Sequence, residues 1–238
     1  MYPHYSPTVA VLGDSQVKYL HTRFVPSCRK FPTMFVSVSG GYIPDFHQEV
    51  DLLPPSVRIV ILNVATNDLA SHDPQPVRQH YLDLLHHIQT RPGIQLVVCS
   101  HVLPRIINRH LHFPNRRFTD AFNHRAEIFN RQLTDICMST PGLFFYTHNL
   151  QACGLPRVLA ADGLHPSFAG VDIMSRNLRA LIPCLLRRTP RPQGASAPDL
   201  HWPTLGEATR MQHTEARRSQ PCRNQPRGIR PHGNQRPN

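Results

Sequence analysis

Five short apolar runs limit the folds open to this chain more than any other feature of its sequence. They lie at residues 9–12, 34–38, 58–64, 95–100 and 143–148. Several are apolar at nearly every position, as expected of strands that are covered on both faces. Amphipathic helical patterns follow at 76–90, 118–137 and 167–186. Strands that alternate with helices predict a parallel sheet, and right-handed crossovers then give an α/β, three-layer flavodoxin-like domain with a five-stranded parallel sheet.

The composition changes sharply near residue 186. Residues 187–238 contain ten arginines, three acidic residues and eight prolines, and their apolar periodicity is lost. This segment accounts for +7 of the chain's net charge of +11. It cannot bury enough apolar surface to offset its chain entropy. We therefore predict a folded domain over residues 1–186 and a disordered Arg/Pro-rich tail over residues 187–238.

Several function classes are disfavoured by composition. No apolar run approaches the roughly 18 residues of a membrane span, and the N-terminal stretch has neither a basic region nor a cleavage site of the signal-peptide kind. We expect an intracellular protein, cytoplasmic or nuclear, with no membrane partner. The six cysteines are scattered, which suits reduced thiols. The sixteen histidines include no H-E-x-x-H pattern, so we expect no metal and no cofactor.

Polar residues that are able to take part in catalysis follow four of the predicted strands. They are Gly13-Asp14-Ser15, Ser39-Gly40-Gly41, Ala65-Thr66-Asn67-Asp68 and, after a loop beyond the fifth strand, Asp162 and His165. In open parallel sheets, ligands bind beyond the carboxyl ends of the strands. We therefore expect a hydroxyl, a flexible backbone amide, a side-chain amide, a carboxylate and an imidazole to meet on one rim.

These groups suit nucleophilic catalysis at an acyl carbon. Serine is a weak nucleophile until a base takes its proton, and His165 is the candidate base for Ser15. Asp162 would hold the imidazole in the required tautomer and stabilise its charged form. The N–H groups of Ser15 and Gly41 and the side-chain amide of Asn67 would bind the developing oxyanion.

Each signal also has a structural interpretation when it is taken alone. The G-D-S triplet is an ordinary cap between a strand and a helix, with Asp14 as a cap or loop brace. Asn67 and Asp68 suit an Asx turn or an N-cap, and Gly40-Gly41 suits a turn. The joint pattern favours catalysis, because each group follows a separate predicted strand and the chain order is Ser, Asp, His.

Four stretches resemble the sequence blocks of the SGNH hydrolases, also called GDSL-type esterases. They are "VLGDSQ", "SVSGGY", "LNVATND" and "DGLHPS", and the resemblance covers residues 8 to about 186. It implies a serine hydrolase of a small acyl ester, with Ser15 as the nucleophile and Asp162 and His165 completing the triad. It also implies Gly41 and Asn67 as oxyanion donors, with Gly40 as the alternative to Gly41.

The third block departs from the family pattern. The family usually has G-x-N-D, whereas this chain has Ala65 at the glycine position. An alanine fits there unless the backbone needs a positive φ.

Two further features leave alternatives open. The stretch "VVCSHVLPR" after the fourth strand, an "N…FN" pattern on a later helix and the Arg/Pro-rich tail together resemble the SGNH domains of animal retroelement-encoded proteins. The tail also suits phosphate contacts with RNA or DNA. The chain is thus an esterase, an SGNH-fold nucleic-acid-binding protein with little or no hydrolase activity, or both. Residues 101–117 form either a lid, in which His101 or Arg105 contacts substrate, or a solvated loop that packs Ile106, Ile107 and Leu111.

Overall fold

The five predicted strands are all present and form one parallel sheet. The structure is a computed structural model that describes residues 6–24 and 32–189. Its strands are β1 (Val9–Gly13), β2 (Thr33–Ser37), β3 (Ile59–Asn63), β4 (Leu96–Ser100) and β5 (Leu143–Tyr146). Their order in the sheet is β2-β1-β3-β4-β5, and every pair is parallel. The predicted α/β fold is therefore confirmed, with strand ends that differ from the prediction by one or two residues.

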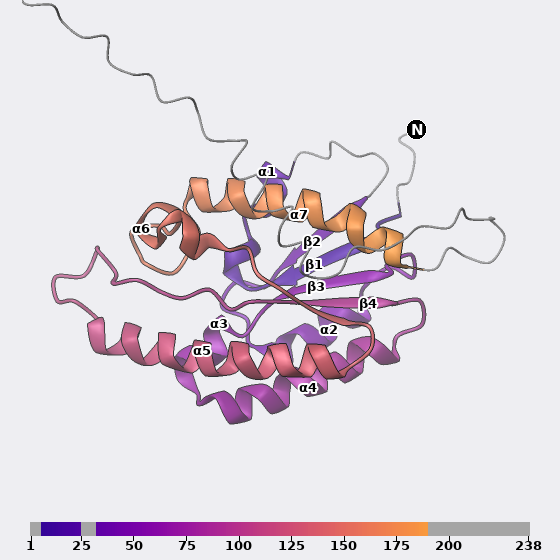
Figure 1. Cartoon of the computed structure of the whole chain (residues 1–238), viewed down its shortest axis with the longest axis horizontal. Helices are drawn as coiled ribbons and strands as arrows, with labels where there is room; N and C mark the ends of the chain where they lie inside the picture. Colours follow the sequence, from indigo (N-terminus) through magenta and orange to yellow (C-terminus); the bar gives the residue numbers. More distant parts are fainter. Residues whose placement is uncertain (1–5, 25–31, 190–238) are drawn as a thin grey trace, which may run out of the picture. The chain divides into compact units, whose positions relative to one another are not determined.

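Three long helices cover the two faces of the sheet. The helix α4 (Pro74–Thr90) and the helix α5 (Arg116–Ser139) lie on one face, and α7 (Phe168–Arg188) lies on the other (Figure 1). All three helical patterns in the sequence are thus confirmed, although α4 and α5 are two and four residues longer than their patterns and α7 begins one residue later and ends two residues later.

Alternate residues of the central strands supply two separate cores. On the α4–α5 side, Ala10 and Leu12 of β1 pack with residues such as Phe129. On the α7 side, Val9 and Val11 pack with residues such as Leu178. All residues of β1, β3 and β4 are buried, which explains why these runs are apolar at successive positions rather than at alternate ones.

The shorter elements do not follow from periodicity. They are α1 (Leu20–Arg23), α2 (Phe46–Asp51), α3 (Thr66–Ser71), α6 (Leu155–Val158) and the 3₁₀ turns η1 (Ser15–Val17), η2 (Ile43–Asp45) and η3 (Leu150–Cys153). The last helix, α7, ends at Arg188, two residues beyond the predicted domain boundary. The predicted tail beyond Thr189 lies outside the described residues.

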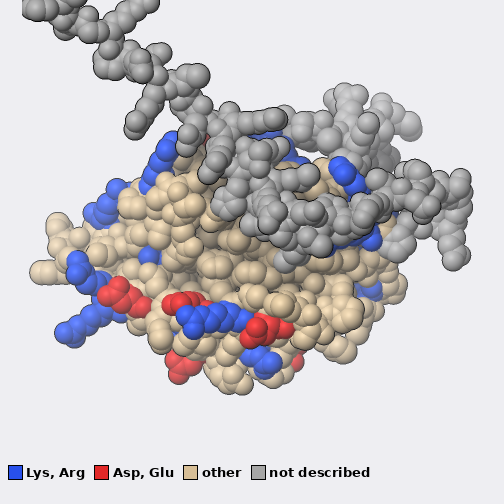
Figure 2. Space-filling model, in the orientation of Figure 1, with Lys and Arg blue, Asp and Glu red and all other residues tan. Residues whose placement is uncertain are grey.

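The surface of the described part carries both signs of charge. On the face shown in Figure 2, the acidic side chains gather in the lower part of the view, where α4 and α5 lie, beside basic ones. Among the helices of the described residues, none combines the length and the apolar character that crossing a membrane requires.

Candidate active site

The turn after β1 presents Ser15 at the end of the sheet. A Cβ atom on Gly13 would lie 2.7 Å from the carbonyl oxygen of Asn63 and 2.8 Å from a methyl carbon of Val17. Only glycine therefore allows the strand to turn so closely into η1. The carboxylate of Asp14 caps η1, since its Oδ1 accepts the N–H of Gln16 at 2.9 Å. The expected cap role of Asp14 is confirmed.

Ser15, His165 and Asp162 come together in a hydrogen-bonded chain. Nε2 of His165 lies 2.8 Å from Oγ of Ser15, and Nδ1 of the same ring lies 2.6 Å from Oδ2 of Asp162. The other carboxylate oxygen of Asp162 accepts the N–H of Leu164 at 2.9 Å and that of His165 at 3.0 Å. The carboxylate therefore fixes both the ring and the loop that carries the ring.

The carboxyl group of Asp162 is the stronger acid of the two carboxyls beside Ser15. Burial by itself would raise its pKa, but the hydrogen bonds from the His165 ring and from the N–H groups of Leu164 and His165 outweigh burial, so its pKa is lowered. Burial raises the pKa of Asp14 to about 6, against the hydrogen bond from Gln16. Asp162 is therefore ionised at neutral pH and able to stabilise a charged imidazole.

The sequence-predicted oxyanion donors also gather at this rim, but they differ in availability. Nδ2 of Asn67 donates to the carbonyl oxygen of Gly41 at 2.9 Å. The N–H of Gly41 donates to the carbonyl oxygen of Val38 at 3.0 Å. The N–H groups of Ser15 and Gly40 make no hydrogen bond within the described part of the chain. Of the two glycine amides, the one of Gly40 is thus the unoccupied donor.

Ala65 has the backbone conformation that glycine normally provides. Its φ is +87°, in the left-handed region, and it lies directly before α3. Its side chain is buried. A positive φ is the condition under which an alanine fits poorly, and it is met here. Ala65 therefore holds a strained conformation two residues before Asn67.

Gln16 joins three loops of the site. No motif or spacing in the sequence indicated this role. Its Nε2 donates to the carbonyl oxygen of Leu164 at 3.2 Å, and its Oε1 accepts the hydroxyl of Thr66 at 3.3 Å. It therefore ties the turn of Ser15 to the start of α3 and to the loop of His165. Only its place next to Ser15 could have suggested it.

Asp68 braces the neighbouring glycine turn. Its two carboxylate oxygens each lie 3.2 Å from the backbone N of Ile43. Burial raises its pKa, and the N–H of Ile43 acts in the opposite direction. Asp68 is therefore a structural carboxylate, as an N-terminal helix residue often is.

Residues 101–117, after β4, were predicted to form either a lid that contacts substrate or a solvated loop with packed apolar residues, and the structure matches each form only in part. Ile106 and Ile107 are half-buried, but Leu111 is exposed at 50%, so its predicted packing is wrong. Arg105 reaches the site, since its Nη2 donates to the carbonyl oxygen of Thr66 at 3.0 Å. His101 lines a cavity whose lining includes none of Ser15, Asp162 and His165.

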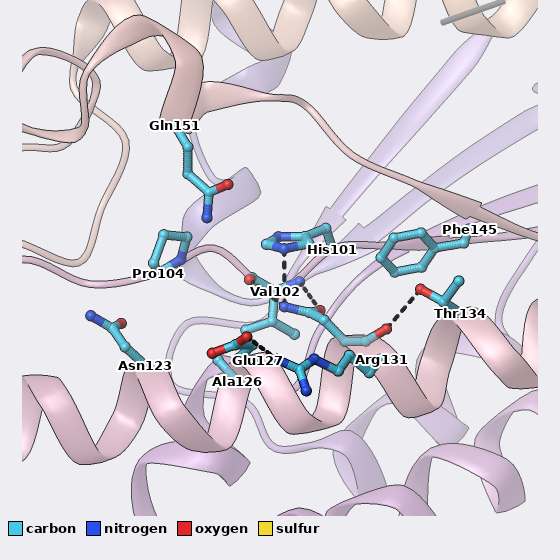
Figure 3. Close-up of a pocket in the computed structure, with 11 residues that line it drawn as sticks. His101, Val102, Pro104, Asn123, Ala126, Glu127, Arg131, Thr134, Phe145 and Gln151 are labelled. Atoms are coloured by element: carbon cyan, nitrogen blue, oxygen red, sulfur yellow. Dashed lines mark hydrogen bonds and ion pairs between the residues drawn. The ribbon is translucent and has the colours of Figure 1, made fainter. Parts of the chain in front are cut away.

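That cavity has a volume of about 410 Å³ and lies between the end of β4, α5 and η3 (Figure 3). It is lined by His101, Val102, Pro104, Asn123, Ala126, Glu127, Asn130, Arg131, Thr134, Phe145 and Gln151. Its polar groups mostly bond within the protein, because Asn130 pairs with the backbone of Val102 and Glu127 pairs with Arg131. No residue of the Ser15 cluster lines it, so the cavity is distinct from the candidate active site.

The described residues contain no group of histidine, cysteine and acidic side chains that is suited to hold a metal ion.

No protein-family model matches the chain, and no curated protein matches it. Solved structures do resemble it. A Bacteroides fragilis protein described as an acylhydrolase has 19% identity and a TM-score of 0.60, over 75% of this chain and 88% of that one. An acetyl xylan esterase has 18% identity and a TM-score of 0.55, over 73% and 99%.

A third solved structure carries the name of the superfamily. A Slackia heliotrinireducens protein described as an SGNH hydrolase has 15% identity and a TM-score of 0.54, over 73% of this chain and 97% of that one. Together these likenesses show that the chain has the fold of SGNH-type esterases and acylhydrolases.

Proposed function

We propose that this protein is an SGNH-type serine esterase that hydrolyses a small acyl ester through Ser15, His165 and Asp162. The observation that carries the proposal is the unbroken chain of contacts, with 2.8 Å from Ser15 Oγ to His165 Nε2 and 2.6 Å from His165 Nδ1 to Asp162 Oδ2. The fold supports it, since proteins described as acylhydrolases and esterases share this arrangement of strands and helices.

In the first half of the reaction, Oγ of Ser15 attacks the carbonyl carbon of the ester while His165 Nε2 takes the hydroxyl proton. The carbonyl π electrons move to its oxygen, which becomes an oxyanion. The N–H groups of Ser15 and of Gly40 or Gly41, together with Nδ2 of Asn67, bind that oxyanion. When the intermediate collapses, the C–O bond to the alcohol breaks and the alcohol takes the proton from His165.

In the second half, water attacks the acyl-serine ester and gives a proton to Nε2 of His165. The new oxyanion is held by the same donors. Collapse breaks the bond to Oγ, Ser15 recovers the proton from His165, and the carboxylic acid leaves. Each oxyanion donor is typically worth about 3 kcal/mol of activation free energy. Throughout, the ionised Asp162 stabilises the imidazolium of His165.

The proposal is tested with p-nitrophenyl esters of increasing acyl length. The acetate is the first substrate, because an acetyl xylan esterase has this fold. Ser15→Ala and His165→Ala should each abolish most of the hydrolysis, and the double variant should be barely slower, because residues that act as a unit are not additive. Labelling by a fluorophosphonate probe should require Ser15. Wild-type turnover by Ser15→Ala would contradict the mechanism.

A second candidate function is nucleic-acid binding by the tail. The sequence observation that favours it is the net charge of +7 over residues 187–238, a composition that resembles the basic segments of retroelement-encoded SGNH proteins. Arginines that neutralise phosphates release counterions, so such binding would weaken steeply with salt. It would coexist with esterase activity, or replace it if Ser15 proves unreactive.

A further inference from the structure

Arg105 is held rigidly against the loop that carries Asp162 and His165. The N–H of the next residue, Ile106, donates to the carbonyl oxygen of Gly163 at 3.0 Å. A Cβ atom on Gly163 would lie 2.1 Å from the carbonyl oxygen of Ile106, so only glycine permits this approach. Asn123 of α5 clamps the Arg105 backbone from the other side, accepting its N–H at 2.7 Å and donating to its carbonyl oxygen at 2.9 Å.

The guanidinium group of Arg105 is fixed beside the proposed oxyanion donors. It lies over the ring of Phe122, with Cζ 4.0 Å from the ring centroid, and 5.6 Å from the centroid of Phe118. Its Nη2 donates to the carbonyl oxygen of Thr66 at 3.0 Å. Thr66 directly precedes Asn67, so the cation stands next to the residue whose side-chain amide is the proposed oxyanion donor.

The donors of this guanidinium are largely unused. Nε is buried and makes no hydrogen bond, and Nη1 makes none within the described part of the chain. No carboxylate of that part forms an ion pair with Arg105, although Asp14 and Asp162 are near enough to oppose the lowering of its pKa by burial. Arginine stays charged under all ordinary conditions, so Arg105 places a half-buried cation, with unused N–H groups on Nη1 and Nη2, near Asp14 and Asp162.

We propose that Arg105 forms an anion-binding subsite of the candidate active site, and that the preferred substrate is an ester that carries a carboxylate or phosphate group close to its scissile bond. This proposal rests on the proposed esterase function. Planar guanidinium groups bind carboxylates and phosphates through two parallel hydrogen bonds, and Nη1 and the second N–H of Nη2 remain for such a contact.

Two matched pairs of esters test the proposal. In the first pair the charge is on the acyl side, with 4-nitrophenyl hemiglutarate against the neutral 4-nitrophenyl pentanoate. In the second it is on the alcohol side, with 3-acetoxybenzoate against its neutral methyl ester. In at least one pair, wild type should prefer the anionic ester in kcat/KM by about 10- to 100-fold, the range expected of charge-assisted hydrogen bonds. Inhibition by inorganic phosphate, at constant ionic strength, shows whether phosphate is accepted as well as carboxylate.

Three variants identify the source of the preference. Arg105→Gln should lower the anionic-to-neutral ratio of kcat/KM by about 10- to 100-fold, mainly through KM of the anionic ester. Arg105→Lys keeps the charge but loses the planar fork, so its ratio of kcat/KM should lie between those of wild type and Arg105→Gln. Arg109→Gln is the matched control, since Arg109 is exposed on the same segment and its side chain makes no hydrogen bond within the described residues. Its ratio should equal that of wild type.

Equal losses on the charged and the neutral ester in both Arg105 variants would overturn the proposal and make Arg105 a structural brace of Thr66. A wild-type enzyme without any preference would overturn it too. If no ester is hydrolysed in a Ser15-dependent way, the proposed esterase function is wrong, and calorimetric titration with glutarate still decides the subsite. Saturable binding that Arg105→Gln weakens by about tenfold or more supports the subsite, and binding that is absent or equal in the two proteins overturns it.

Discussion

The side-chain amide of Asn67 donates a hydrogen bond to the carbonyl oxygen of Gly41, with 2.9 Å between Nδ2 and that oxygen. The bond joins the first turn of α3 to the glycine turn that follows β2. A primary amide carries two N–H groups, so one is left for a substrate. Asp68 and Ile43 make a second link between the same two segments. The proposed donors are therefore oriented relative to one another before any substrate binds.

The Asn67→Ala variant should lower kcat by about 10²- to 10³-fold with little change in KM, because it removes a contact made only in the transition state. Steady-state kinetics on p-nitrophenyl acetate measure both constants. Thermal unfolding of the same variant is the control, since the bond to Gly41 is lost as well. A loss of less than threefold would mean that Asn67 only braces the Gly41 turn.

The Ala65→Gly variant should be at least as stable as wild type and at least as active. A left-handed conformation costs a non-glycine residue roughly 1–2 kcal/mol, whereas glycine costs roughly 0.5–1 kcal/mol in chain entropy. We expect a gain of up to about 1 kcal/mol in the free energy of unfolding, measured by urea denaturation. The Ala65→Val variant is the opposing control and should be destabilised. A clear loss of stability in Ala65→Gly would show that the methyl group of Ala65 contributes more packing energy than its φ of +87° costs.

The Gln16→Met variant should lower kcat by about 10- to 100-fold, since small displacements of reacting groups are costly. The substitution preserves length and burial but removes both hydrogen bonds, to Thr66 and to Leu164. Single-turnover measurements would separate the chemical step from product release. Gln48→Met, on the exposed surface of α2, is the matched control. If both variants retain full rates, the three loops keep their positions without the Gln16 side chain.

The raised pKa of Asp14 predicts a specific dependence of the free energy of unfolding on pH. Its pKa is raised from 3.8 to about 6 by burial, so the folded state binds its proton more tightly than the unfolded state does. Its contribution to stability is therefore complete below about pH 4 and is lost as pH rises through about 6. Asp14→Asn keeps the acceptor for Gln16 and does not titrate.

The free energy of unfolding of Asp14→Asn, relative to wild type, should therefore rise between pH 4 and pH 7, by on the order of 3 kcal/mol. Urea denaturation at a series of pH values measures this difference. Asp120→Asn, at an exposed position of α5, should show no such trend. A difference that is constant over this range would contradict the raised pKa of Asp14.

A chain cut after Thr189 tests the tail. The boundary lies one residue beyond the end of α7, because a cut at the predicted residue 186 would remove the last two residues of that helix. The shortened chain should fold cooperatively and keep its esterase activity within a few-fold, since every proposed catalytic residue lies before residue 166. If the full chain binds RNA or DNA, truncation should weaken binding and flatten its salt dependence. Equal affinity for the two chains would exclude a role for the tail.

The predictable and unpredictable parts of this protein differ in physical origin. Strands such as β3 and helices such as α4 were predictable, because burial on one or two faces leaves a periodic pattern in the sequence. The positive φ of Ala65 and the occupied N–H of Gly41 left no such pattern. They depend on contacts between loops that are distant in sequence, such as that between Gln16 and Leu164.

The same principle separates the site residues that were predicted from the loop residue whose burial was predicted wrongly. Ser15, Asn67 and His165 could be placed on one rim because each follows a strand of the sheet. The exposure of Leu111 was not predictable, because an apolar residue in a long loop is buried only if another segment covers it.

The position of β1 between β2 and β3 has a consequence for local opening of the molecule. The backbone of β1 pairs with a strand on each side and is fully buried, so its amide hydrogens should exchange only on global unfolding. The loop of His165 belongs to no strand of the sheet. Besides the Gln16 contact, it is joined to the rest of the protein by backbone bonds such as those from the N–H groups of Ile106 and Arg109 to the carbonyl oxygens of Gly163 and Ala161. We therefore expect the nucleophile and the base to belong to regions of unequal local stability. If this loop opens more readily than the sheet, its opening equilibrium would set the fraction of molecules ready to react, and substitutions that leave the global stability unchanged would alter that fraction.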